Sequence, residues 1–141
     1  MSVVATSVAT AVTKKCTGGI CRGTVEADRL YGTPGFDRIY GGRGADRIYG
    51  GGASDELRGG AGRDKIRAGA GNDTVLGGPG ADRISGRAGV DRLYGGYGND
   101  VIHGSLDGDR DYFYCGPGRD EAVVGPNDVV AASCEVVDIR E

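Results

Sequence analysis

An aspartate returns every nine residues through most of this chain. The ten members of the series are Asp28, Asp37, Asp46, Asp55, Asp64, Asp73, Asp82, Asp91, Asp100 and Asp109. An aliphatic residue stands two places after each of the first nine aspartates, and glycines are frequent in the five positions before each aspartate. A short period of fixed length is the sequence signature of stacked repeats. The periodicity therefore restricts the chain to a solenoid.

The repeating unit reads Gly-Gly-x-Gly-x-Asp-x-aliphatic-x. Nine residues divide into a glycine-rich turn of about six residues and an extended segment of about three, in which only the middle side chain points inward because strand side chains alternate faces. One aliphatic side chain per unit cannot bury itself, whereas stacked units can form a continuous column. The pattern predicts a column of Leu, Ile and Val between two parallel sheets.

Two successive units make one 18-residue coil, with alternate turns on opposite edges of a flattened roll. We therefore expect an all-β fold, a parallel β-roll (β-solenoid) of about five coils with a cap at each end. The predicted organisation is an N-terminal arm and cap at 1–22, the roll at 23–112 and a C-terminal cap at 113–141. The nine-residue spacing breaks after Asp100 and resumes between Asp111 and Asp120, which places Phe113 at an inward position.

Composition excludes several classes of protein. Glycine supplies 29 of 141 residues, against a usual share of roughly 7%, so an ordinary packed globule is excluded. The net charge is −3, which argues against a nucleic-acid partner. No apolar run approaches the length of a membrane span. His103 is the only histidine and falls at an outward strand position, so no Ser-His-Asp or Cys-His constellation is available and we do not expect an enzyme.

Four stretches of the chain resemble a known family. They are Gly41-Gly-Arg-Gly-Ala-Asp46-Arg-Ile-Tyr49, Gly59-Gly-Ala-Gly-Arg-Asp64-Lys-Ile-Arg67, Gly77-Gly-Pro-Gly-Ala-Asp82-Arg-Ile-Ser85 and Gly95-Gly-Tyr-Gly-Asn-Asp100-Val-Ile-His103. These are similar to the hemolysin-type calcium-binding (RTX) nonapeptide. The resemblance implies a β-roll with calcium between stacked turns, held by backbone carbonyls and aspartates. It also implies an extracellular protein whose folding depends on calcium.

Electrostatics leads to the same expectation. Aspartates stacked about 4.8 Å apart repel one another by about 1 kcal/mol in water and about 3 kcal/mol at an effective dielectric constant of 20. A hard divalent cation with oxygen ligands, calcium in preference to magnesium, neutralises such a row. The candidate ligands for several calcium ions are Asp37, Asp46, Asp55, Asp64, Asp73, Asp82, Asp91 and Asp100. The alternative is a metal-free solenoid held by Arg–Asp ladders between coils.

The two edges differ in glycine content. Turns 41–46, 59–64, 77–82 and 95–100 of one edge keep all three motif glycines. On the other edge Thr33 and Arg87 replace the second glycine, Ala53 the third and Ala68 the first. Glycine is needed where the backbone has positive φ or approaches closely. We therefore expect ions to fill the gaps among Asp46, Asp64, Asp82 and Asp100 first.

The four cysteines lie at the two ends of the repeats. The rigid solenoid separates them, so Cys16–Cys21 and Cys115–Cys134 are the expected disulfides, and disulfides imply an oxidising compartment. Residues 2–11 are small and apolar and end in Ala9-Thr-Ala11. This segment is expected to be a shortened signal peptide or a disordered arm.

A secreted calcium-binding roll with a structural, adhesive or surface-interaction role is the leading functional hypothesis. The alternative is an accessory roll that assists the folding or export of a separate enzyme. Outward tyrosines beside basic residues are expected to form stacking ladders, and they also offer a face for an extracellular polysaccharide or protein. This tyrosine set is Tyr31, Tyr40, Tyr49, Tyr94 and Tyr112.

Overall fold

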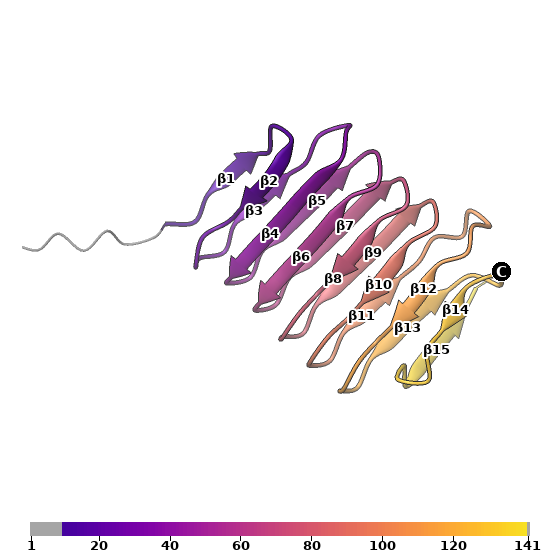
Figure 1. Cartoon of the computed structure of the whole chain (residues 1–141). Helices are drawn as coiled ribbons and strands as arrows, with labels where there is room; N and C mark the ends of the chain where they lie inside the picture. Colours follow the sequence, from indigo (N-terminus) through magenta and orange to yellow (C-terminus); the bar gives the residue numbers. More distant parts are fainter. Residues whose placement is uncertain (1–9, 141) are drawn as a thin grey trace, which may run out of the picture.

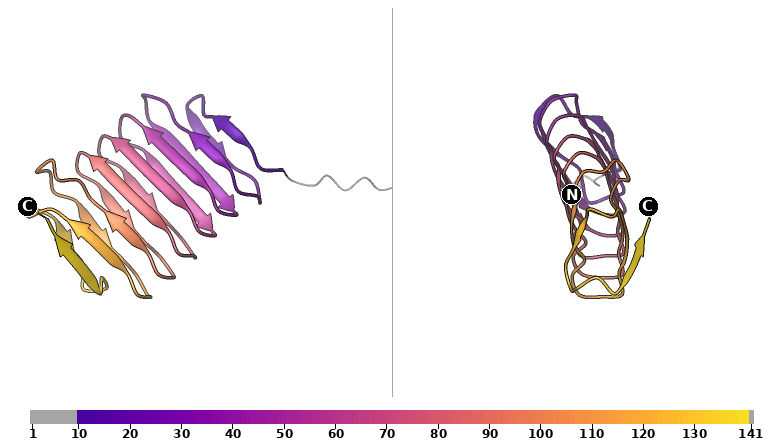
Figure 2. Two further views of the ribbon diagram at one scale, coloured as in Figure 1. Left: turned by 180° about the vertical axis from the view of Figure 1, so that it is seen from behind. Right: turned by 90° about the vertical axis from the view of Figure 1, so that its right-hand side faces the viewer.

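A computed structural model describes residues 10–140, which form a flattened roll of parallel strands (Figures 1 and 2). Residues 2–9 of the expected leader segment lie outside the described residues. Along residues 10–140 no helix is long and apolar enough to cross a membrane.

The strands alternate between two facing sheets. The odd sheet contains β1 (Thr13–Lys15), β3 (Arg29–Tyr31), β5 (Arg47–Gly51), β7 (Lys65–Ala70), β9 (Arg83–Ala88), β11 (Val101–His103), β13 (Glu121–Val124) and β15 (Val136–Ile139), in that order. The even sheet contains β2 (Gly19–Arg22), β4 (Asp37–Arg43), β6 (Glu56–Ala61), β8 (Thr74–Leu76), β10 (Arg92–Tyr94), β12 (Tyr112–Tyr114) and β14 (Val129–Val130). Each strand therefore hydrogen-bonds to the strand two places along the chain.

The register confirms a coil of 18 residues. Ile48 is the partner of Ile66, and Leu57 is the partner of Val75. The sheets contain eight and seven strands, so the roll has about seven turns where the sequence predicted about five coils. The difference arises because chain before residue 23 and after residue 112, outside the predicted roll, continues the same sheets. The predicted domain boundaries after residues 22 and 112 stay predictions.

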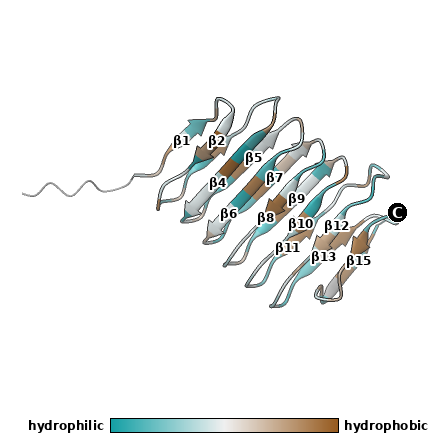
Figure 3. Ribbon diagram, in the orientation of Figure 1, coloured by the Kyte–Doolittle hydropathy of each residue, from teal (hydrophilic) through white to brown (hydrophobic). Residues whose placement is uncertain are grey.

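The core is one column of side chains along the roll axis. Leu30, Ile39, Ile48, Leu57, Val75, Leu93, Ile102 and Phe113 are fully buried, and Ile66 and Ile84 nearly so. Figure 3 shows hydrophobic segments on successive strands beside hydrophilic ones, as expected for strands with one inward and two outward side chains. Burying a Leu or Ile side chain contributes roughly 1.5–3 kcal/mol.

The break in spacing is a surface loop. The main-chain N–H of Asp91 donates to Asp111, 20 residues later, instead of to a residue 18 later. Asp109, the last member of the nine-residue series, is exposed, and Asp111 takes the equivalent place inside. The two extra residues are accommodated in the loop before Asp111. Phe113 is consequently inside, as predicted, and Tyr114 follows at the outward position that stacks on Tyr94.

Both expected disulfides are present. Cys16 is bonded to Cys21 and Cys115 to Cys134, and no cysteine is free. Cys16, Cys21 and Cys115 belong to the buried core and Cys134 packs against it. Each bridge therefore covers one end of the aliphatic column.

The two bridges should contribute unequally to stability. Because disulfides restrict the unfolded chain according to loop length, removing Cys115–Cys134 (separation 19) should cost about 3 kcal/mol and removing Cys16–Cys21 (separation 5) about 2 kcal/mol. Urea unfolding of the two double Cys→Ala variants measures the difference. A larger loss from the N-terminal pair would contradict this ranking.

Candidate metal centre

The repeat aspartates line the inside of the turns. Eleven of them are buried, with relative exposures of 0–3%, whereas the residue that follows each one faces outward or lies at the surface. A strand alternates its side chains, so an aspartate at the end of the turn shares the inner side with the aliphatic residue two places later. The sequence pattern thus forces carboxylates into the interior.

A hydrogen bond links every buried carboxylate except that of Asp37 to the previous coil; within the described residues Oδ1 of Asp37 has no partner. The main-chain N–H of Asp46 donates to Oδ1 of Asp64 at 2.8 Å, and that of Asp64 donates to Oδ1 of Asp82 at 2.8 Å. The same bond recurs at 2.7–2.9 Å along both edges. Oδ1 is therefore committed to holding the coils together, and Oδ2 is the oxygen left for other ligands.

The aspartates form one row on each edge. The first edge carries Asp28, Asp46, Asp64, Asp82, Asp100 and Asp120, and the second carries Asp37, Asp55, Asp73, Asp91 and Asp111. All eight predicted site residues lie in these rows. The predicted ligands did not include Asp28, Asp111 and Asp120. The nine-residue spacing from Asp111 to Asp120 could have identified the last two.

Most Oδ2 atoms are buried without a partner. Within the described residues, no hydrogen bond reaches Oδ2 of Asp46, Asp55, Asp64, Asp73, Asp82, Asp91, Asp100 or Asp120. An unpaired buried polar atom costs about 1–3 kcal/mol, and a charged one costs more. Eight such atoms in two rows call for a ligand that the polypeptide does not supply.

Near the ends of the rows, the chain itself supplies donors to three Oδ2 atoms, but not to Oδ2 of Asp120. Oδ2 of Asp28 accepts from the main-chain N–H and hydroxyl of Thr24, and Oδ2 of Asp37 accepts from the same groups of Thr33. Oδ2 of Asp111 accepts from the N–H of Ser105 at 3.1 Å. These three hydroxyl residues stand where the complete motif has its second glycine. The Thr and Ser substitutions are visible in the sequence, but their role as donors to Oδ2 was not predicted.

Glycine at the first turn position creates an oxygen-lined cradle. A Cβ at Gly59 would lie 2.4 Å from Oδ2 of Asp64 and 2.7 Å from the carbonyl oxygen of Gly77 in the next coil. Gly41, Gly77 and Gly95 have the same surroundings. At these four turns a carboxylate oxygen and a carbonyl oxygen thus converge at the point where the Cβ of any other residue would lie.

The second edge is less regular. Ala68 occupies a first turn position there, and its methyl group is fully buried in the space that glycine leaves free elsewhere. Ala53 and Arg87 have φ of 61° and 76°, a left-handed conformation that costs a non-glycine residue roughly 1–2 kcal/mol. One cradle of the second edge is therefore filled and two of its turns are strained, while Gly32 and Gly50 keep the oxygen neighbours seen on the first edge.

Burial raises the pKa of the central carboxyls. Desolvation is the main cause, and the neighbouring aspartates of the row add repulsion: the pKa rises to about 6 for Asp64, to about 7 for Asp55 and Asp82, and to about 8 for Asp91. The N–H donated from the previous coil opposes the rise. Without a counterion, the ionised rows are unfavourable near neutral pH.

Arginine does not neutralise the rows. The ion pairs in the described part of the chain are Arg38–Glu56, Arg58–Glu56 and Arg140–Asp138, and none includes a buried aspartate. The alternative of Arg–Asp ladders is therefore wrong. Where a basic residue follows a buried aspartate, as at Arg47, Lys65 and Arg83, its side chain is exposed on the outer face, where it cannot reach a carboxylate inside the turn.

The oxygen donors fit calcium. Calcium takes six to eight oxygen ligands, including carboxylates and backbone carbonyls, in flexible geometry. Over residues 10–140 no three acidic, His or Cys side chains converge on one point. A site here would consequently combine an Asp Oδ2 with carbonyl oxygens of adjacent turns. The ion would supply positive charge between the coils.

Comparisons with known proteins agree with this chemistry. The family model of the RTX calcium-binding nonapeptide repeat matches in four overlapping copies, at residues 22–57, 49–84, 76–111 and 85–121. No curated protein and no solved structure matches the chain. The matched copies together contain both rows of buried aspartates.

The calcium-free protein should become less stable as the pH rises. The folded state has carboxyl pKa values of about 6 to 8 at Asp64, Asp55, Asp82 and Asp91, whereas the unfolded value is near 3.8. Between these values the folded state binds more protons, so the free energy of unfolding falls with rising pH. Urea unfolding of metal-depleted protein at pH 5 and pH 8 measures the change.

Saturating calcium should weaken or reverse this pH dependence, because the metal requires ionised carboxylates. Metal-depleted protein that is more stable at pH 8 than at pH 5 would contradict the assignment of raised pKa values to the buried rows.

Proposed function

The chain belongs to the RTX calcium-binding nonapeptide repeat family, and we propose that it is a secreted β-roll stabilised by several calcium ions, with a structural or adhesive role. The calcium-binding repeats and the solenoid make it a calcium-binding structural roll.

The observation that carries the proposal is the set of unpartnered Oδ2 atoms in the aspartate rows. Seven of the sequence-predicted ligands have this property: Asp46, Asp55, Asp64, Asp73, Asp82, Asp91 and Asp100. Asp120 joins them. Asp37 offers only Oδ1, because Thr33 occupies its Oδ2. Calcium bound to these oxygens would remove the repulsion within each row and join neighbouring coils.

The two disulfides support an extracellular role. Disulfides persist in oxidising compartments, and both ends of this roll carry one. Extracellular calcium modules bind with dissociation constants of about 10⁻⁴–10⁻³ M. We infer that the chain folds or becomes rigid when it reaches a calcium-rich exterior. A rigid roll with two long sheet faces suits surface contact better than catalysis.

Calcium should raise the melting temperature strongly. Each site adds about 2.7 kcal/mol to the free energy of unfolding when the calcium concentration is about one hundred times the Kd of the site. For a domain of this size, that gain raises the melting temperature by roughly 5–10 °C. Thermal melts followed by circular dichroism in excess chelator and in calcium measure the shift. An unchanged melting temperature would refute calcium stabilisation.

The shift should depend on which carboxylate is removed. Asp64→Asn should reduce it more than Asp55→Asn, because Asp64 lies among four consecutive turns with complete glycines, whereas Asp55 adjoins the closed Asp37 and the strained Ala53. Asp28→Asn is the matched control on the first edge, since Thr24 and Val12 already satisfy its oxygens. It should leave most of the calcium shift intact.

If Asp64→Asn and Asp55→Asn reduced the calcium-induced melting shift equally, glycine content would not determine which edge binds calcium more strongly. A calcium shift that Asp28→Asn abolishes as completely as Asp64→Asn would mean that the unpartnered Oδ2 atoms do not mark the sites.

A further inference from the structure

A column of cations runs across the outer face of the odd sheet. Arg29, Arg47, Lys65 and Arg83 are direct register partners on four consecutive strands. All four side chains are exposed. Adjacent strands lie about 4.8 Å apart, so the column presents four positive charges along about 14 Å. This set is called the cation column below.

No acidic side chain is paired with the cation column in the described residues. The even sheet is built differently, because Glu56 lies between Arg38 and Arg58 and pairs with both, at 3.4 Å and 2.7 Å. Like charges directly opposite on neighbouring strands are destabilising. The odd sheet therefore maintains a repulsive arrangement that its own side chains do not relieve, in a protein whose net charge is −3.

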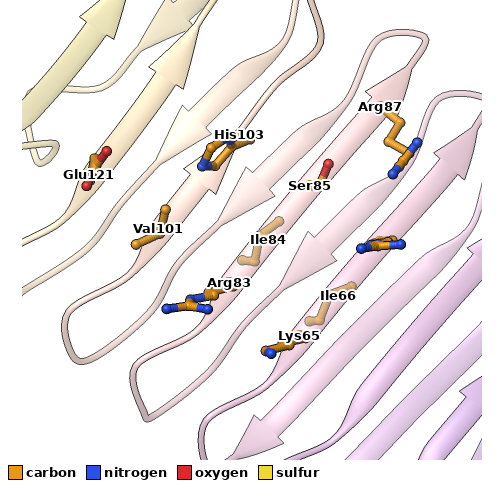
Figure 4. A pocket seen from close by; sticks show the side chains of 10 residues that line it. Lys65, Ile66, Arg83, Ile84, Ser85, Arg87, Val101, His103 and Glu121 are labelled. Carbon is orange, nitrogen blue, oxygen red and sulfur yellow. The ribbon is translucent and has the colours of Figure 1, made fainter.

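The cation column borders a groove. A hollow of about 610 Å³ lies over β7, β9 and β11 where the short side chain of Ser85 stands between Arg67 and His103. Figure 4 shows the hollow with Lys65, Arg83 and Arg87 along it and Glu121 at one end. Glu121 is the only acidic residue in the lining. The groove thus combines positive charge with hydroxyl and imidazole donors.

We propose that the cation column and this groove bind a linear acidic polysaccharide, lying across the strands along the roll axis. A flexible polyanion can place successive charges beside successive coils. The inference rests on the proposed function, because the secreted, calcium-stabilised roll is what keeps the cations in line. Calcium itself binds the inner carboxylates and leaves this outer face positive.

The aromatic side chains of the odd sheet favour a sugar polymer over a single-stranded nucleic acid. Tyr31 and Tyr49 stack on each other with centroids 4.9 Å apart, and Arg67 lies over the Tyr49 ring. The stacked faces of the two rings are therefore covered, whereas a nucleobase needs an exposed aromatic face on which to stack. The phenol hydroxyls remain available as hydrogen-bond partners for sugar hydroxyls.

Binding of a fluorescent heparin oligosaccharide to the full chain in excess calcium tests the proposal. Arg47→Gln/Arg83→Gln removes two members of the cation column. Arg22→Gln/Arg92→Gln removes the same charge from the even sheet, where both side chains are exposed. Because two surface charge contacts are lost, the first pair should weaken binding about tenfold and the control pair much less. Dextran, a neutral polysaccharide, should not bind.

Three outcomes would overturn the proposal: no heparin binding by the folded protein, equal losses for the two double variants, or tighter binding of a single-stranded DNA of equal charge. Calcium-induced melting shifts of both variants should match the unsubstituted protein. If neither the unsubstituted protein nor the variants showed a calcium-induced melting shift, the proposed function would be wrong. If the melting shifts were intact but heparin did not bind, only this inference would be wrong.

Discussion

The structure depends on one hydrogen bond, from the main-chain N–H of each repeat aspartate to the carboxylate one coil later. This bond fixes the 18-residue register and turns the carboxylate into the interior beside the aliphatic column. Glycine is then favoured at the first turn position, because a Cβ at Gly59 would overlap Oδ2 of Asp64 and the carbonyl of Gly77, although Ala68 stands at this position on the second edge. The same bond that orders the coils therefore creates rows of buried charge that need a counterion.

The second turn residue determines whether a carboxylate needs a ligand from outside the chain. Thr24, Thr33 and Ser105 direct an N–H to Oδ2 and close the site. Glycine at that position leaves Oδ2 open, as at Asp64. The closed aspartates Asp28, Asp37 and Asp111 lie toward the ends of the rows, whereas Asp120, the last of the first row, is open like the central ones. The open carboxylates are the ones that call for a ligand from outside the chain.

The repeat and its coil length could be predicted from the sequence because each nonapeptide carries the same glycine, aspartate and aliphatic positions. Both disulfides were also predictable, since a rigid roll keeps the two cysteine pairs apart. The coil count was not predictable, because residues such as Ile20, Val129 and Val137 extend the sheets without the motif. The closure of Asp37 by Thr33 also escaped prediction, since it depends on backbone direction in one turn.

A crystal structure grown in calcium, with anomalous diffraction, tests the central claim most directly. Calcium at the buried rows predicts anomalous peaks between successive turns of the first edge, within coordination distance of Oδ2 of Asp46, Asp64, Asp82 and Asp100 and of backbone carbonyl oxygens. Well-ordered maps with water or protein donors at these oxygens, and no anomalous peak along either edge, would contradict it.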